Sequence, residues 1–297
     1  MSGSARPLII GVNVNENTMR DTNPHIPWSP EEIAATAAEC EAAGASVMHF
    51  HARTDDGRAD HSAERYGQTI RSVRARSGLV LAPSLANLPG ASVEERLSNI
   101  APNQGRDETK VELLPIDMGC ANMDLFDPDA REFATDELVF VNSTRAQEKL
   151  ITWASEHEAR PYLASFNLSW TRAILAHVAA GRLAEPVCMV LVLGGEEFVA
   201  AHPVTDGGVE SHLALFPPGV HIEWMVSAYR GNVLEVAETV VARGGHVAIG
   251  AGDHHYAELD APTTAELVRQ VARIGLRHGR RPATTRQARA MLLGGAA

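Results

Sequence analysis

The sequence lacks the features that mark disulfide-rich, secreted and membrane proteins. It has only three cysteines in 297 residues, at Cys40, Cys120 and Cys188, and no C-x-x-C pair for zinc or redox chemistry. We therefore expect buried free thiols in a reducing cytoplasm. No apolar run approaches the roughly 20 residues that a bilayer requires. The apolar run near the N-terminus is too short for a signal peptide, so the sequence predicts a soluble cytoplasmic protein.

Basic charge is also scarce, because the net charge is −11 and acidic residues are spread along the chain. Nucleic-acid-binding proteins carry basic patches that neutralise phosphates, so the composition argues against that class. No G-x-G-x-x-G motif follows the first apolar run, which weakens a dinucleotide-binding interpretation. An apolar fraction of 45% is ample for a full core. An acidic average still leaves room for a local cationic pocket that takes a small anionic substrate.

What the chain does contain is a regular alternation of short apolar strands and helices. We predict strands at 8–14, 47–53, 78–84, 109–118, 161–166, 187–193, 221–227 and 246–249. We predict helices at 30–43, 62–75, 93–100, 145–158, 170–180, 209–215, 234–242, 264–276 and 285–292. The strands are uniformly apolar, as expected when both faces of a sheet are covered. The alternation predicts a single (β/α)₈ TIM-barrel domain over residues 1–297.

Two histidines lie at the end of the second predicted strand, in the segment V-M-H-F-H-A-R at 47–53. Alternate residues of a strand face the same side, so His49 and His51 point in one direction and can chelate a divalent metal. On the motif alone, two hydrogen-bonded histidines without a metal are the commoner case. In a TIM barrel, however, the chemistry takes place at the carboxyl ends of the strands. The barrel prediction therefore favours metal binding by this pair.

Polar residues that follow other predicted strands should share the same mouth of the barrel. The further candidates are Glu16, Asn17, Ser84, Asp253 and His254. Strands 1, 2 and 8 are neighbours in a closed barrel, so Glu16, Asp253 and His254 are within reach of a metal on the two histidines. Three of these candidates keep an ordinary alternative: a solvated loop acid for Glu16, a turn cap for Asp253 and a turn hydroxyl for Ser84.

Several short motifs follow one another along nearly the whole chain. They are N-P-x-x-P-x-S-P-E-E at 23–32, A-A-G-A at 42–45, H-x-H-x-R at 49–53, G-x-x-N at 119–122, G-G-H-V at 244–247 and G-R-R-P-A-T at 279–284. Together they resemble the β-keto acid cleavage enzyme family, which includes the 3-keto-5-aminohexanoate cleavage enzyme. The resemblance implies a TIM barrel and a homotetramer or homodimer.

The resemblance also implies a reaction: condensation of a β-keto acid with acetyl-CoA, which gives acetoacetate and a new CoA thioester. It implies Zn²⁺, or another divalent metal, on the two strand-2 histidines and a strand-8 glutamate, where the metal polarises the keto oxygen. A strand-8 aspartate, here Asp253, transfers a proton. Ser84 and the first loop, with Glu16 and Asn17, position the substrate.

The eighth strand departs from the family motif R-x-G-x-E-D-N. This chain has A-I-G-A-G-D-H at 248–254, so Gly252 replaces the metal-binding glutamate and Ala248 replaces the arginine. Asp253 is kept. A site with two histidines alone would hold zinc weakly, so we expect His254, or Asp253 itself, to provide the third ligand.

Two functions remain open on these grounds. The first is a divergent metal-dependent enzyme that acts on a carbon–carbon bond of a keto acid or CoA ester. The second is a barrel that has lost the parent reaction and binds a ligand, serves a structural role or acts as a metal-dependent hydrolase or lyase. The retained histidines and Asp253 favour the first.

Overall fold

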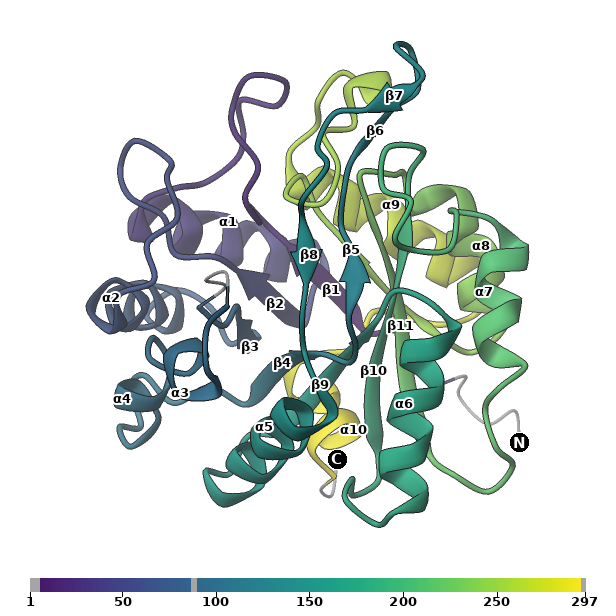
Figure 1. The fold of residues 1–297 in the computed structure, drawn as a ribbon. Helices are drawn as coiled ribbons and strands as arrows, with labels where there is room; N and C mark the ends of the chain where they lie inside the picture. The colour runs from purple at the N-terminus through teal and green to yellow at the C-terminus, as the bar shows by residue number, and fades with distance from the viewer. Residues whose placement is uncertain (1–5, 87–89, 295–297) are drawn as a thin grey trace.

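An eight-stranded parallel sheet, rolled almost into a closed barrel, forms the centre of the protein (Figure 1). The computed structural model describes residues 6–86 and 90–294. The barrel strands are β1 (Ile10–Asn13), β2 (Val47–Phe50), β3 (Val80–Pro83), β4 (Leu113–Asp117), β9 (Arg160–Ser165), β10 (Val187–Gly194), β11 (Ile222–Tyr229) and β12 (His246–Ile249). Their order is β3-β2-β1-β12-β11-β10-β9-β4, and the end strands β3 and β4 contact each other. The predicted TIM barrel is confirmed.

Helices cover the outside of the barrel, most of them between successive strands, while Ala288 and Leu292 of the last helix pack with the residues inside the barrel (Figure 1). They are α1 (Pro30–Ala43), α2 (Ala63–Arg74), α3 (Val93–Arg96), α4 (Ala101–Gln104), α5 (Thr144–Glu156), α6 (Leu168–Ala179), α7 (Asp206–Leu213), α8 (Leu234–Ala242), α9 (Thr264–Arg277) and α10 (Thr285–Leu293), with a 3₁₀ turn at Ala257–Leu259. Among the described residues, no helix is both long and apolar enough to cross a membrane.

Local sequence signals fix the ends of the first helix. The Ser29 hydroxyl accepts a hydrogen bond from the Glu32 backbone N–H, and the Glu32 carboxylate accepts one from the Ser29 N–H, which is a complete capping box. Gly44 ends the helix with a φ of 115°, a conformation that favours glycine. The predicted helix at 93–100 is shorter in the structure: α3 ends at Arg96, and a second short helix, α4, begins at Ala101. Pro102 lies in the first turn of α4, where its missing N–H would have no partner within the helix.

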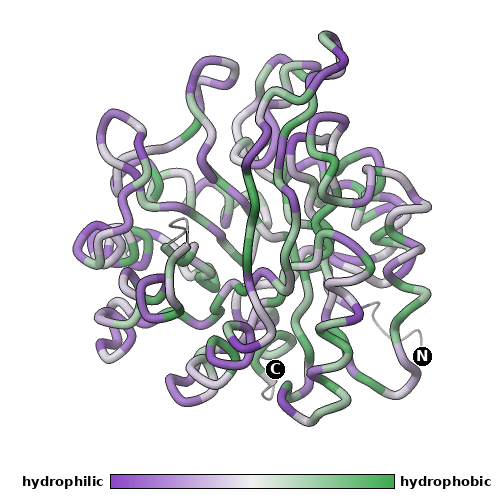
Figure 2. The backbone as a smooth tube through the Cα atoms, in the orientation of Figure 1, coloured by the Kyte–Doolittle hydropathy of each residue, from purple (hydrophilic) through white to green (hydrophobic). Residues whose placement is uncertain are grey.

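An antiparallel arm between β4 and α5 is not among the predicted strands and helices. In this arm β5 (Ala121–Asn122) pairs with β8 (Val139–Phe140), and β6 (Phe126–Asp127) pairs with β7 (Glu132–Phe133). Strands of two residues are too short to leave a periodic signal. Figure 1 shows the arm extending past the barrel, and Figure 2 shows an apolar stretch along β8.

The arm exposes apolar side chains and one cysteine. Its large exposed apolar residues are Phe133, Leu138, Val139 and Val141. Cys120, at the base of the arm, is also exposed, whereas Cys40 and Cys188 are buried free thiols. The expectation of three buried cysteines is therefore wrong for Cys120, because this residue lies outside the packed layers of the barrel.

The barrel has two apolar layers, one in the interior that the sheet encloses and one between the sheet and the surrounding helices. Val47 of β2 belongs to the inner layer, whereas Met48 and Phe50 pack in the outer layer. The alternation of the strand therefore turns His49 toward the barrel interior. Parallel register places His49 beside Asn13 of β1 and Ala82 of β3.

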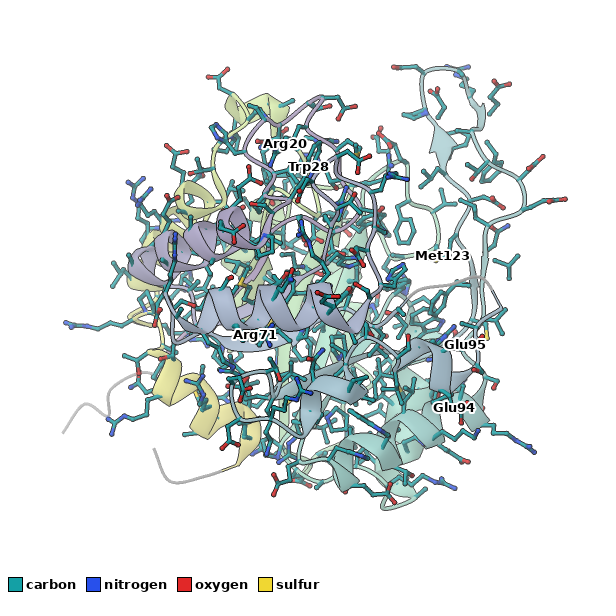
Figure 3. All side chains as sticks on the ribbon, turned by 90° about the vertical axis from the view of Figure 1, so that its left-hand side faces the viewer. Arg20, Trp28, Arg71, Glu94, Glu95 and Met123 are labelled. Carbon is teal, nitrogen blue, oxygen red and sulfur yellow. The ribbon has the colours of Figure 1, made fainter. Side chains whose placement is uncertain are left out.

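The long connection between β1 and α1, residues 14–29, lies at the carboxyl end of the strands. Arg20 stacks over the Trp28 ring at 4.1 Å, and its guanidinium lies 2.6 Å from the Glu32 carboxylate. Figure 3 shows Arg20 and Trp28 next to each other in this segment. These contacts tie the outer part of the connection to the start of α1.

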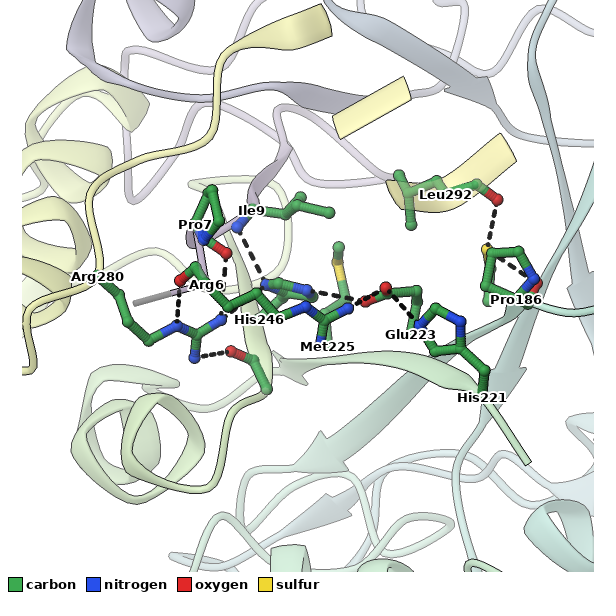
Figure 4. A network of polar contacts seen from close by, with 12 residues as sticks. Arg6, Pro7, Ile9, Pro186, His221, Glu223, Met225, His246, Arg280 and Leu292 are labelled. Carbon is green, nitrogen blue, oxygen red and sulfur yellow. Dashed lines mark hydrogen bonds and ion pairs between the residues drawn. The ribbon is translucent and has the colours of Figure 1, made fainter. Parts of the chain in front are cut away.

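A buried charge network lies at the opposite, amino end of the barrel (Figure 4). The Glu223 side chain is 1% exposed, and its oxygens lie 3.0 Å from His221 Nε2 and 3.2 Å from His246 Nε2. Arg6 forms an ion pair with the same carboxylate. His246 Nδ1 in turn accepts the backbone N–H of Ile9 at 3.0 Å. The network therefore joins β11, β12 and the segment before β1.

We expect Glu223→Gln to lower the free energy of unfolding by about 2 kcal/mol, because a buried carboxylate that pairs with several donors is lost. Chemical denaturation measures this change. Glu210→Gln is the control, since Glu210 pairs with Arg243 on the surface, where one ion pair contributes less than about 1 kcal/mol. Equal effects of the two variants would contradict the interpretation.

Candidate metal centre and active site

A cavity of about 280 Å³ opens at the carboxyl ends of the barrel strands. Six of the seven site residues predicted from the sequence line it, and His254 does not. The six are Glu16, Asn17, His49, His51, Ser84 and Asp253. The arm contributes Met123, Phe140 and Asn142 to the wall, so the cavity lies between the barrel and the arm.

The two histidines meet a carboxylate from the first loop. Glu16 Oε1 lies 3.3 Å from His49 Nε2, and Glu16 Oε2 lies 2.8 Å from His51 Nε2. One potential ligand atom from each of the three residues lies within 4.8 Å of the other two. Two imidazoles and one carboxylate are a common ligand set of catalytic zinc, which keeps a further position open for water or substrate. The residues present therefore fit a divalent cation.

The His49 ring is oriented for metal binding by a second contact. Its Nδ1 lies 2.6 Å from the backbone oxygen of Ala82, so Nδ1 carries the proton and donates to that carbonyl. Nε2, on the other side of the ring, then faces Glu16. A ligand histidine that donates its other N–H to a carbonyl is the usual arrangement at metal sites, because the contact fixes the tautomer.

The charges of Glu16 and the two histidines depend on one another. Burial by itself would raise the pKa of Glu16, but the neighbouring imidazoles lower it well below the usual value. Burial would likewise lower the pKa of His49, but the Glu16 carboxylate raises it to about 9. Without a metal, the His49 ring is therefore doubly protonated near neutral pH, with the second proton on Nε2 facing Glu16. A divalent cation must displace that proton, so metal affinity is expected to rise with pH.

The structure does not bring His254 to the two histidines, although the sequence suggested it as the third ligand. His254 Nε2 lies 3.1 Å from Glu258, outside the cavity. Glu16, predicted as a substrate-positioning acid, lies there instead. The order of the strands predicts that Glu16 is within reach of the two histidines, but it does not reveal the loop conformation that turns Glu16 toward them, with a φ of 38° that non-glycine residues rarely adopt.

Asp253 lies beside this centre, as the order of strands predicts. It is 8% exposed, and its Oδ2 accepts a hydrogen bond from Asn13 Nδ2 at 2.6 Å. Burial, and then the nearby Glu16 carboxylate, raise the pKa of Asp253 well above its usual value. A buried carboxyl with such a raised pKa suits proton transfer near neutral pH.

Ser84 and Asn17 complete the predicted set. The Ser84 hydroxyl lies 2.6 Å from the buried Tyr66 hydroxyl, and its backbone oxygen accepts from Asn99. The Tyr66 contact holds the turn after β3 against α2, and the Asn99 contact joins it to the turn between α3 and α4. Asn17 is exposed at the rim of the cavity.

Two further charged residues line the cavity and were not among the predicted site residues. Asp117 is the last residue of β4, and Arg96 ends α3. Burial raises the pKa of Asp117 to about 6, against the lowering effect of the Arg96 and His49 charges. An aspartate at the end of a barrel strand is a signal that a search for chemistry at the strand ends can find.

We expect Asp117→Asn to stabilise the metal-free protein above pH 6. The folded-state pKa lies above the usual 3.8, so folding is opposed as pH rises through this window and the unfolded chain ionises first. The gain should be about 1–2 kcal/mol at pH 7.5, discounted because the group faces the cavity, and close to zero at pH 3.5. Thermal unfolding at both pH values measures it. A gain that does not depend on pH would contradict the assignment.

Comparison with known proteins gives the family. A model of the beta-keto acid cleavage enzyme family matches residues 7–293. The chain is 28% identical over 280 residues to the 3-keto-5-aminohexanoate cleavage enzyme of Acetoanaerobium sticklandii, which covers 92% of this chain and 93% of that protein. It is 27% identical over 302 residues to the 3-oxoadipate:acetyl-CoA acetyltransferase of Cupriavidus necator, covering 97% of this chain and 95% of that protein.

The fold is also similar to that of a solved structure, apo ObcA, with a TM-score of 0.70 at 17% sequence identity. The match covers 91% of this chain, which spans 65% of the ObcA chain. That likeness supports the barrel fold alone. The family match over nearly all of the chain supports more: the protein belongs to the beta-keto acid cleavage enzyme family.

Proposed function

We propose that this protein condenses a β-keto acid with acetyl-CoA and releases acetoacetate and a new CoA thioester. The observation that carries the proposal is the meeting of Glu16, His49 and His51 next to Asp253 in one cavity. The names of the relatives from A. sticklandii and C. necator support the substrate class. The proposal covers the class of small-molecule substrate, a keto acid together with a CoA ester.

The three ligands would hold Zn²⁺ or another divalent cation. When bound, such a cation supplies a Lewis acid that polarises the keto oxygen of the substrate. Glu16 restores the carboxylate ligand that the strand-8 motif lacks at Gly252. This ligand set replaces the expectation that His254 or Asp253 completes the centre.

Asp253 would provide the proton chemistry. The carbon between the keto group and the carboxylate of a β-keto acid is acidic, and Asp253 in its ionised form accepts a proton from it. The resulting carbanion forms a bond to the acetyl carbon as the thioester bond breaks and CoA leaves. CoA then attacks the original keto carbon, the old carbon–carbon bond breaks, and the acetoacetate carbanion takes the proton back.

Polar groups on the rim would orient the substrate during these steps. The Ser84 hydroxyl and the Asn17 amide can donate hydrogen bonds to the substrate carboxylate, while Asn13 holds Asp253 in place. We also propose a cytoplasmic location and a homotetramer or homodimer. The exposed apolar side chains of the arm support such an assembly, because large exposed apolar patches mark interaction surfaces.

Metal binding is the first test. We expect the purified protein to bind about one divalent cation per chain, and His49→Ala and Glu16→Ala to weaken binding at least about 100-fold, because each removes one of three protein ligands. Elemental analysis and titration with Zn²⁺ measure this. Asn17→Ala and His254→Ala are the controls and should bind as the wild type does. Loss of binding in His254→Ala with retention in Glu16→Ala would reverse the ligand assignment.

Turnover is the second test. We expect acetoacetate from acetyl-CoA and a β-keto acid, assayed with 3-oxoadipate, 3-keto-5-aminohexanoate and 3-oxohexanoate as the keto acids. Asp253→Asn should lower kcat about 10²- to 10⁴-fold, the usual contribution of a general base, and should keep the affinity for metal. Full activity of Asp253→Asn would contradict its role. Metal binding without turnover of any of these acids would favour a ligand-binding protein or another metal-dependent activity.

A further inference from the structure

A buried arginine lies two residues after His51 and contacts the loop that carries Glu16. Arg53 is 2% exposed, and no carboxylate among the described residues lies within ion-pair distance of it. Its guanidinium donates instead to backbone oxygens: Nη1 to Glu16 at 2.7 Å, Nη2 to Thr18 at 3.2 Å and Nε to Gly57 at 2.7 Å. The Arg53 guanidinium thus joins the first loop, at Glu16 and Thr18, to the segment that follows β2, at Gly57.

The backbone that Arg53 holds is in an unfavourable conformation. Glu16 has a φ of 38°, a strained conformation that a non-glycine residue keeps only where the surrounding structure imposes it. The Asn15 side chain adds a second connection, because it accepts the N–H of His51 at 2.9 Å and donates to the carbonyl of His51 at 2.8 Å. The strand end that carries the histidines therefore also holds the Glu16 backbone.

The other face of the loop rests on the backbone of Gly252. The Thr18 hydroxyl donates to the Gly252 oxygen at 2.5 Å, and the Gly252 N–H donates to Asn13 at 3.1 Å. A Cβ atom at position 252 would lie 2.5 Å from the Asn15 backbone nitrogen. Any side chain there would push the loop away, so the close approach requires glycine.

We propose that Arg53 is a positioning residue that holds Glu16 in its metal-binding place before a cation arrives, and that Gly252 provides the space for it. The inference rests on the proposed metal centre. A ligand that is already in place loses little conformational freedom when the cation binds, so affinity is higher. The flat guanidinium suits this task, because it presents several fixed N–H donors to separate carbonyls, which a lysine cannot do.

A purely structural role for Arg53 is the competing explanation, and the chain offers a matched control. Arg280 is 5% exposed at the amino end of the barrel. It also donates to backbone oxygens, with Nη1 at 2.9 Å from Val241 and 2.6 Å from Gly245, and Nε at 3.1 Å from Arg6. Its replacement removes comparable bonds far from the proposed metal centre.

The test compares metal affinity and coordination in purified full-length variants. Zn²⁺ affinity is measured by competition with a chromophoric chelator, and Co²⁺ loading adds a visible absorption spectrum that reports the ligand geometry. We expect Arg53→Met to weaken Zn²⁺ binding about 10- to 100-fold, the usual effect of removing an outer-sphere contact, and to change the Co²⁺ spectrum. Arg53→Lys should lie between this variant and the wild type. Gly252→Ala should change affinity in the same direction as Arg53→Met.

Arg280→Met should lose stability in thermal unfolding and keep the wild-type affinity and spectrum. If Arg53→Met does not fold, Arg53→Lys and Gly252→Ala decide. Wild-type affinity and spectrum in the Arg53 variants would overturn the positioning role alone, as would an equal loss of affinity in Arg280→Met. Absence of Zn²⁺ and Co²⁺ binding by the wild type would overturn the metal centre as well.

Discussion

The contact of one carboxylate with two imidazoles sets the charge of the cavity at the mouth of this barrel. Glu16 lowers the cost of burying charge on His49, and the imidazoles keep Glu16 ionised in a site where burial would otherwise protonate it. The same carboxylate has the opposite effect on Asp253, because burial, and then the like charge of Glu16, raise the pKa of the Asp253 carboxyl. One side chain thus sets the protonation of both the proposed ligands and the proposed base.

The barrel supplies the geometry for this contact through strand alternation and parallel register. Alternation turns His49 inward, and register places it between Asn13 and Ala82, which orient Asp253 and the His49 ring respectively. The opposite end of the barrel is closed by a different charge network around Glu223. The proposed metal centre and the Glu223 network therefore lie at opposite ends, and in this fold the carboxyl ends of the strands are where active sites are usually found.

Much of this was accessible from the sequence, because the informative signals were local. Short apolar runs, a helix cap such as Ser29 and a helix stop such as Gly44 each act over a few residues, and together they predict the alternation of strands and helices that makes the barrel. The H-x-H pair is likewise a local motif, at the end of one predicted strand. The arm was missed because its strands have two residues each. The place of Glu16 depends on a positive φ and on a distant arginine, neither of which periodicity reveals.

The three proposed ligands, Glu16, His49 and His51, all come from the first strand–helix–strand unit of the chain. A glutamate at position 252 would have tied the last strand to the second through the cation, across most of the sequence. In this protein the coordinating atoms are separated by short stretches of chain, so little loop-closure entropy opposes their meeting. The cation would then fasten the start of the barrel, and the seam between the first and last strands would rest on the backbone pairing of β1 with β12 and on the hydrogen bond from the Thr18 hydroxyl to the Gly252 oxygen.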